Sequence, residues 1–257
     1  MGIHQTAIVD TKAEIGNNVT IGPFSVIEED VMIGDSCNIK SHVLIASGSR
    51  LGNNIFVGKG AVLGTPPQDL KFEGEVTTLE IGDGTVIREF ATLNRGTSYH
   101  YKTVIGENCF IMAYVHVAHD CFIGNNVIIA NAVNMGGHVI IEDYAGIGGM
   151  AAIHQFVRIG QHCFISGLSK VRKDVPPYIL AVDDPLRYGG TNHVGLSRRG
   201  FSKETIMELK RAYRLIYKSG FTVTEALNRI EESPDLLPEI ENIINFTKSS
   251  ERGLIRG

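Results

Sequence analysis

Three short segments of this chain carry residue types that could do chemistry: His119-Asp120, Gly137-His138 and His154-Gln155. A histidine beside an aspartate is typical of a general base that a carboxylate holds in one tautomer. The chain has no Gly-x-Ser-x-Gly motif for a nucleophilic serine, and none of its cysteines is expected at the surface. This pattern favours direct transfer, in which His119 takes a proton from a substrate hydroxyl as that hydroxyl attacks a carbonyl.

A repeat of six residues must position these segments. Aliphatic residues or methionine occupy every sixth position from Ile3 to Val171, with exceptions only at Asp69, Glu75 and Tyr99. This period fits neither an α-helix nor a long strand and predicts a parallel β-solenoid of hexapeptide repeats. We call these periodic residues anchors. Glycine follows many of them, as tight corners with unusual backbone angles would require.

The residue four positions after each anchor is expected to point inward as well, because it is small or β-branched at most repeats. All four cysteines fall at this position: Cys37, Cys109, Cys121 and Cys163. We therefore expect them to fill space in the core, rather than bind metal or form disulfides.

Three hexapeptides in each turn would stack residues eighteen apart, separated by about 4.8 Å. The eighteen residues between Leu63 and Ile81 agree with such a turn. Stacking then places His119 below Gly137, and it brings Asp120 and His138 onto the same outer corner. The backbone N–H of Gly137 could approach a developing oxyanion there. Other histidines are expected to be solvated or interface groups: His4, His42, His100 and His162.

Two loops are expected to interrupt the repeat region before it ends. Prolines in residues 65–80 predict a loop that projects from the solenoid, and residues 98–102 predict a smaller excursion. Pro176 and Pro177 are expected to stop ladder pairing. Helices are predicted over 202–218, 224–231 and 238–248, with Ser202 as a cap and Gly220 as a terminator. We expect a solenoid domain at 1–190 and a helical domain at 191–257.

Composition excludes several classes of protein. The 257 residues carry a net charge of −4 and no tryptophan, so a general nucleic-acid-binding surface is not expected. The polar amino terminus enters the repeat at Ile3, which leaves no room for a signal peptide, and no integral membrane segment is predicted. We expect a cytoplasmic protein.

Six stretches resemble the UDP-N-acetylglucosamine 3-O-acyltransferases that open bacterial lipid A synthesis. They are Pro67-Gln68-Asp69-Leu70-Lys71, His116-Val117-Ala118-His119-Asp120-Cys121, Gly136-Gly137-His138, His154-Gln155-Phe156, Asp174-Val175-Pro176-Pro177-Tyr178 and Gly195-Leu196-Ser197-Arg198-Arg199-Gly200-Phe201. The resemblance implies a homotrimer of left-handed parallel β-helices with α-helical tails and active sites between subunits. Left-handedness is implied by the resemblance alone, because crossovers between parallel strands are generally right-handed.

The resemblance also implies an activity. A 3-hydroxyacyl chain would pass from the phosphopantetheine of acyl carrier protein to the 3-position of UDP-N-acetylglucosamine, with no other cofactor and no metal. His119 would be the catalytic base, Asp120 its orienting partner and Gly137 the oxyanion donor. Further positions match substrate-binding residues: Gln68, Asp69, Lys71, His116, His138, His154, Gln155, Asn192 and Arg198.

Three details refine what the resemblance implies. Gly167 matches the residue that sets acyl length, and a glycine there implies an open groove and a fairly long chain. Val194 departs from the family, which often has an acidic residue at this position. The acidic carrier protein could dock on a basic group, formed by Arg158, Lys170, Arg172 and Lys173.

Four other functions are compatible with parts of the sequence. A 3-amino UDP-sugar could be the acceptor, which would give an amide in the same pocket. The related N-acyltransferase of this pathway would carry a uridine-binding domain before its repeats, and here they begin at residue 3. A hexapeptide-fold carbonic anhydrase could bind zinc through His116, His119 and His138. A scaffold without catalytic activity would show no acyl transfer at all.

Overall fold

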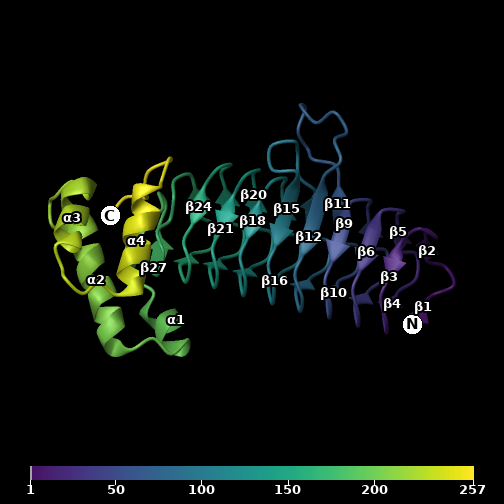
Figure 1. Cartoon of the computed structure of the whole chain (residues 1–257), viewed down its shortest axis with the longest axis horizontal. Coiled ribbons are helices and arrows are strands. Elements are labelled where there is room, and N and C mark those ends of the chain that lie inside the picture. The colour runs from purple at the N-terminus through teal and green to yellow at the C-terminus, as the bar shows by residue number, and fades with distance from the viewer. Residues whose placement is uncertain (1) are drawn as a thin grey trace.

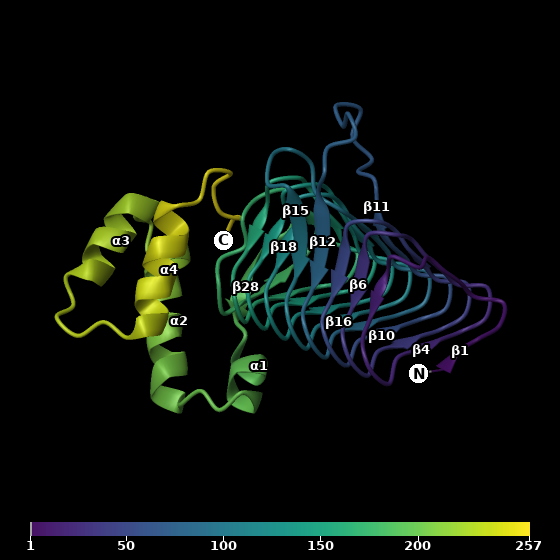
Figure 2. The same cartoon turned by 45° about the vertical axis from the view of Figure 1, so that its right-hand side comes forward.

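In the computed structural model, which describes residues 2–257, the repeat region winds into a three-sided coil (Figures 1 and 2). Sheet A contains β1 (Gly2–Ile3), β4 (Thr20–Ile21), β7 (Asn38–Ile39), β10 (Phe56–Val57), β13 (Val86–Ile87), β16 (Phe110–Ile111), β19 (Ile128–Ile129), β22 (Gly146–Ile147), β25 (Phe164–Ile165), β27 (Ile179–Val182) and β28 (Arg187–Thr191). Sheet B contains β2 (Ile8–Val9), β5 (Val26–Ile27), β8 (Leu44–Ile45), β11 (Val62–Thr65), β14 (Thr92–Asn94), β17 (His116–Val117), β20 (Asn134–Met135), β23 (Ala152–Ile153) and β26 (Lys170–Val171). Sheet C contains β3 (Glu14–Ile15), β6 (Val31–Ile33), β9 (Ser49–Leu51), β12 (Thr78–Ile81), β15 (Lys102–Ile105), β18 (Phe122–Ile123), β21 (Ile140–Ile141) and β24 (Arg158–Ile159).

The chain passes from sheet A to B to C in every turn, which gives the coil three edges. We name them the A–B, B–C and C–A edges. Strands eighteen residues apart pair in parallel, for example Gly2 with Thr20 and His116 with Asn134. The coil is a left-handed parallel β-helix, as the resemblance implied (Figure 2).

Anchors form the core of the coil. From Ile21 to Val171, no anchor is more than 5% exposed. The four cysteines are buried and unpaired, as expected from their position four residues after an anchor. Removal of so many aliphatic side chains from water is the main source of stability in such a fold.

The corners use glycine differently from our expectation. At most corners the third residue after the anchor has a left-handed backbone and is usually not glycine, for example Asn18 with φ 57° and Asn54 with φ 57°. Glycine directly after an anchor instead allows close approach of successive turns. A Cβ at Gly22 would lie 2.8 Å from the carbonyl carbon of Lys40, in the turn above.

Two loops leave the coil at the B–C edge (Figures 1 and 2). The long loop, residues 66–77, joins β11 to β12, and the short loop, residues 95–101, joins β14 to β15. The interval from Leu63 to Ile81 is therefore one side of the prism plus a twelve-residue insertion. Its agreement with a complete turn was a coincidence, although the turn of eighteen residues is confirmed elsewhere.

Pro176 and Pro177 do not end the ladder, contrary to our expectation. Val175 bridges to Ile159, and β27 pairs in parallel with β25. The two prolines lie at the C–A edge between these contacts, where a ladder donor is not required. Strand β28 then returns antiparallel to β27, a hairpin that the six-residue pattern did not indicate.

Four helices follow: α1 (His193–Arg198), α2 (Lys203–Lys218), α3 (Val223–Glu231) and α4 (Pro238–Lys248). Ser202 caps α2 through a bond to the N–H of Thr205, and Gly220 follows its end with φ 81°. Both were expected, whereas α1 was not. Helix α2 packs beside β28, and the division into domains at residue 190 stays a prediction. Within residues 2–257, no helix combines the length and apolar character needed to span a bilayer.

Candidate active site

The predicted catalytic residues gather at the B–C edge, beside the two loops. His119 and Asp120 follow β17, and Gly137 and His138 follow β20 in the next turn. Successive corners are joined by backbone bonds, because the His138 N–H donates to the His119 carbonyl at 3.1 Å. The stacking that we predicted from a turn of eighteen residues is thus observed for this edge.

His119 and Asp120 form a hydrogen-bonded pair. His119 Nδ1 lies 2.8 Å from Asp120 Oδ2, and the side chains are 13% and 0% exposed. An ionised carboxylate can only accept, so Nδ1 carries the proton and Nε2 keeps a lone pair. His119 is therefore oriented as a general base, with Nε2 available to a substrate.

Its corner position had indicated that Asp120 lies on the outer surface, but the residue is buried. The short loop covers it, and Thr97 and His100 donate to its carboxylate. Burial by itself would raise the pKa of Asp120, but the hydrogen bonds from His119, Thr97 and His100 outweigh burial and hold that pKa below its usual value. Asp120 is therefore ionised at neutral pH.

Gly137 lies directly against the imidazole of His119. A Cβ at position 137 would fall 2.5 Å from Cε1 and 2.7 Å from Nε2 of His119, closer than atoms can approach. The N–H of Gly137 donates to no other backbone group among residues 2–257. Only glycine allows this close approach, and its N–H remains available beside the base.

His138 lies beside His119. Its ring is 5.1 Å from that of His119, edge to face, and it stacks on Phe156 at 4.3 Å. Burial lowers the pKa of His138, while the carboxylates of Asp120 and Asp69 act in the opposite direction.

Other predicted residues lie around this group. His116 Nδ1 is 2.7 Å from Thr92 Oγ1, and burial lowers the pKa of His116. His154 and Gln155 are exposed in the turn above Gly137. On the long loop, Asp69 accepts from the Lys71 N–H at 3.0 Å, while Gln68 and the Lys71 side chain are exposed.

Three predicted residues do not join the group within one chain. Gly167 is exposed at the A–B edge, a different edge from that of His119. Asn192 is only 7% exposed and its amide is engaged, because it accepts from the Gly195 N–H and donates to the His162 carbonyl. Arg198 is exposed at the end of α1, and Figure 1 shows this helix on the side of the molecule opposite the two projecting loops.

The basic residues at this end of the edge differ in availability. Arg172 and Lys173 are exposed and follow β26, one turn above His154 and Gln155. Lys170 is exposed on sheet B. Arg158 is not free, because its guanidinium bonds Ser249 at 2.7 Å, pairs with Glu142 at 3.5 Å and lies over the Phe246 ring.

Among the described residues, one group of three could share a metal ion: His119, Asp120 and His138, whose ligand atoms lie within 4.8 Å of one another. His116, the third histidine of the zinc alternative, is not in this group. The oxygens of Asp120 already accept hydrogen bonds from the short loop. This chemistry fits a base held by a carboxylate better than a histidine metal site.

Sequence reasoning missed the short loop as part of the site. Thr97 and His100 contact Asp120, and Tyr99 lies edge-on to His138 at 4.6 Å. A signal was available, because Leu93 and Val117 are paired anchors separated by twenty-four residues. The six extra residues must leave the corner directly below His119.

His162 was also misjudged. It is 8% exposed, stacked between Tyr144 at 4.7 Å and Tyr178 at 5.7 Å, with Phe201 against its edge. Burial lowers its pKa to about 4. The stack supports the packing of the C-terminal region on the coil.

Two family models match the chain. Residues 174–255 match the model described as UDP N-acetylglucosamine O-acyltransferase, domain 2. Residues 12–47 and 102–137 match the model of the bacterial transferase hexapeptide, six repeats.

Curated relatives and solved structures match almost the whole chain. An acyl-[acyl-carrier-protein]--UDP-N-acetylglucosamine O-acyltransferase from Sulfurihydrogenibium sp. is 56% identical over 98% of this chain and 93% of its own length. A relative with the same name from Chlorobaculum parvum is 52% identical over 98% and 96%. The crystal structure of a UDP-N-acetylglucosamine acyltransferase from Bacteroides fragilis is 46% identical over 98% and 99%, with a TM-score of 0.97.

Proposed function

This chain belongs to the UDP-N-acetylglucosamine O-acyltransferases of lipid A synthesis, and from that premise we propose how it works. We propose that it moves a 3-hydroxyacyl chain from acyl carrier protein to the 3-hydroxyl of UDP-N-acetylglucosamine, by direct attack on the thioester. The observation that carries this mechanism is the His119–Asp120 pair directly beneath Gly137.

In the first step, His119 Nε2 accepts the proton of the sugar hydroxyl as its oxygen attacks the thioester carbonyl. Asp120 stabilises the imidazolium that forms, because its carboxylate accepts from Nδ1. The negative charge that develops on the carbonyl oxygen is stabilised by the Gly137 N–H. The C–S bond then breaks, and His119 returns the proton to the leaving thiolate.

The remaining side chains of this edge would orient the sugar and the acyl chain. Asp69 and Lys71, with Gln68, extend from the long loop toward the sugar. His116, His138, His154 and Gln155 would complete the pocket, as the resemblance implied. His138 is favoured as a neutral hydrogen-bonding group, since burial lowers its pKa.

The nucleotide would be held by residues outside this edge. An arginine suits a diphosphate, because its planar fork donates paired, charge-assisted bonds, and Arg198 is exposed. Asn192 would act indirectly by capping α1, the helix that carries Arg198. Val194, which is 48% exposed, offers no charged group to the ribose or uracil.

A homotrimer is part of this proposal, and the A–B edge supports it. Five of its corner residues are apolar, exposed and left-handed in backbone conformation: Phe24, Phe90, Tyr114, Met150 and Leu168. Such a conformation is unfavourable for bulky side chains, and exposure to water adds a second cost. Contact with neighbouring subunits would remove the second cost.

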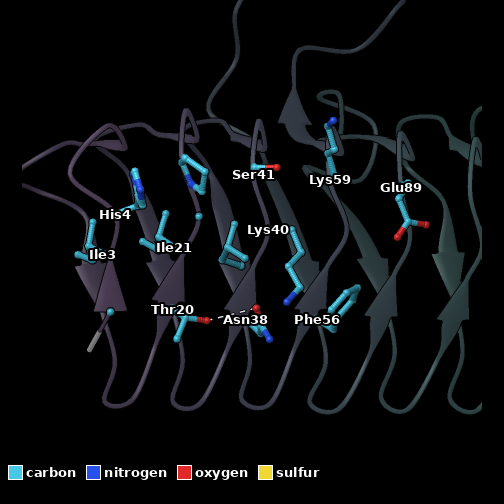
Figure 3. Close-up of a pocket in the computed structure, with 14 residues that line it drawn as sticks. Ile3, His4, Thr20, Ile21, Asn38, Lys40, Ser41, Phe56, Lys59 and Glu89 are labelled. Atoms are coloured by element: carbon cyan, nitrogen blue, oxygen red, sulfur yellow. Dashed lines mark hydrogen bonds between the residues drawn. The ribbon is translucent and has the colours of Figure 1, made fainter.

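The outward faces of the sheets also support a trimer. Among outward residues of the two-residue strands, sheets A and B carry one charge, at Lys170, whereas Glu14 and Arg158 lie on sheet C. A shallow trough of about 660 Å³ on sheet A passes over Thr20 and Asn38 (Figure 3). We propose that sheets A and B face neighbouring subunits and that sheet C faces solvent. Gly167 of one subunit would then limit the acyl groove of another.

We propose that the acyl carrier protein docks at Arg172 and Lys173, which we name the basic tip. Lys170 is left out, because it lies on sheet B, which we propose to face a neighbouring subunit. Arg158 is removed from our earlier group, because its guanidinium is already paired. A cytoplasmic location is also proposed. Four unpaired cysteines favour it, since disulfides are rare in that compartment.

The test is an acyl-transfer assay with purified protein, UDP-N-acetylglucosamine and a set of acyl carrier protein thioesters of different length. We expect ester formation with a fairly long 3-hydroxyacyl chain, and a loss of at least about a hundredfold in His119→Ala, because a positioned base contributes that much. The variant should keep its fold, since His119 lies outside the core. The 3-amino acceptor is assayed in parallel; transfer to it alone would contradict the ester product.

A further inference from the structure

The short loop has no role in the mechanism above, yet it makes most of the contacts of the Asp120 carboxylate. Resting on the proposed function, we propose that Thr97 is a positioning residue, whose hydroxyl and backbone hold Asp120 so that the carboxylate aligns His119 for proton transfer. Thr97 itself does not reach the reacting atoms.

Four hydrogen-bond contacts from Thr97 and His100 reach the carboxylate. Thr97 Oγ1 donates to Asp120 Oδ2 at 2.6 Å, and the Thr97 N–H lies 3.2 Å from both carboxylate oxygens. The His100 N–H donates to Oδ1 at 3.1 Å. With His119 at 2.8 Å, the carboxylate is held on both oxygens.

The direction of the Thr97 hydroxyl is itself determined. Its oxygen accepts from the Tyr99 N–H at 3.2 Å, so its proton is left to point at Asp120. The loop is closed by the Tyr101 N–H, which donates to the Thr97 carbonyl at 2.7 Å. Thr97 is 7% exposed, so water does not replace these bonds. The hydroxyl is therefore a fixed donor in a dry environment, where it counts for more than at a surface.

Asp120 needs such support. It has a left-handed backbone with φ 56°, and it is buried with a negative charge. The Oδ2 atom that accepts from Thr97 also accepts from His119, so a shift of the carboxylate would move the imidazole. Gly137 leaves the ring no spare room, since a Cβ there would fall 2.5 Å from Cε1. A small rotation would misalign Nε2, and misplaced catalytic groups lose much of their effect.

The test compares Thr97→Val, which keeps the shape and removes the hydroxyl, with Thr97→Ser, which restores it. We expect kcat of Thr97→Val to fall roughly tenfold, a part of what a positioned base contributes, with KM for the sugar nucleotide nearly unchanged. Thr97→Ser should recover most of the rate. The matched control is Thr103→Val, because Thr103 Oγ1 is buried without a partner in the neighbouring strand, and it should keep full activity.

The pH dependence separates positioning from general damage. Loss of a donor to the charged form raises the pKa of Asp120 in Thr97→Val. Protonation of Asp120 then begins at higher pH, so the rate of the variant relative to wild type should decrease as pH falls. A pH-independent ratio, an effect confined to KM, or failure of Thr97→Ser to recover the rate would overturn the proposal.

A spectroscopic readout keeps this test independent of acyl transfer. In protein labelled with ¹⁵N-histidine, the Nδ1 proton of His119 is identified by its loss in His119→Gln. We expect this signal to shift or broaden in Thr97→Val and to persist in Thr97→Ser and Thr103→Val. An unchanged signal in Thr97→Val would overturn the proposal that Thr97 positions Asp120. If the signal moves but wild type transfers no acyl group, the proposed function fails and the positioning role of Thr97 stands.

Discussion

The proposed mechanism depends on individual residues that are packed without spare space. Gly137 provides the clearest case, because the ring of His119 occupies the position that a Cβ would need. His119 in turn is held by Asp120, and Asp120 by Thr97. From His119 onward, each residue in this series is held by the next.

Gly137→Ala should therefore displace the imidazole of His119 and weaken the oxyanion donor at once. We expect kcat to fall by about a hundredfold or more, since loss of one oxyanion donor alone typically costs 10²–10³. The melting temperature should change little, because position 137 lies outside the core. Steady-state kinetics and thermal unfolding of the same preparation check this; Gly136→Ala, one position earlier, is a comparison variant. Full activity in Gly137→Ala would contradict the assigned geometry.

His162 makes stability depend on pH in a predictable direction. The unfolded chain binds a proton at this residue near pH 6.5, whereas burial lowers its pKa in the folded protein to about 4. The contribution of neutral His162 to the free energy of unfolding is thus fully present above pH 6.5. It is lost as pH falls toward 4, by on the order of 3 kcal/mol.

His162→Phe keeps the stacking with Tyr144 and Tyr178 but cannot bind a proton. We expect its free energy of unfolding to fall less than that of wild type between pH 7.5 and pH 5, as measured by urea titration. His42→Phe, which changes an exposed histidine in the same way, serves as the control. Parallel losses in wild type and His162→Phe would show that His162 is not responsible.

At the scale of elements, the regular turns were predictable and the insertions were not. Anchors and the residues four after them repeat without interruption from Ile105 to Val171, so simple counting placed His119 below Gly137. The burial of Asp120 could not be counted in this way, because it depends on how the short loop folds over the corner. The β27–β28 hairpin and α1 also lie beyond the periodic region, where no spacing guided the prediction.

The basic tip follows strand β26, which the periodic stack of turns places above the predicted active site. Arg172 and Lys173 lie one turn above His154 and Gln155, on the same edge as His119. Replacement of both by glutamate should raise KM for acyl carrier protein thioesters about tenfold, because like charges would face an acidic partner. The same acyl chain on free pantetheine should react as with wild type. Equal losses with both donors would contradict docking at this tip.

At the scale of the whole molecule, the proposed mechanism needs residues from more than one subunit. Gly167 is exposed at the A–B edge, and His119 lies at the B–C edge. The A–B edge carries exposed, left-handed aromatic residues, and we propose that neighbouring subunits cover them. Assembly and activity should therefore be lost together.

The variant Phe90→Glu with Tyr114→Glu tests this dependence. These rings stack at 5.3 Å and are 44% and 60% exposed. We expect a folded monomer by light scattering and circular dichroism, with no measurable acyl transfer, since two buried charges per subunit would oppose association. Met32→Glu, on sheet C at 43% exposure, should remain a trimer with normal activity. An active Phe90→Glu/Tyr114→Glu monomer would contradict sites shared between subunits.

The two ends of the coil differ in a way that bears on how the protein comes apart. Residues Gly253–Arg256 return to the coil, where Leu254 bridges to Asp174 and Arg256 to Arg187, whereas Ile3 and Ile8 of the first turn are 41% and 66% exposed. In a stack where each rung touches only its neighbours, fraying begins at the less protected end. Amide hydrogens should thus exchange with deuterium first in the N-terminal turns and later in each following turn. The surroundings of the His119 imidazole should therefore persist until late in denaturation.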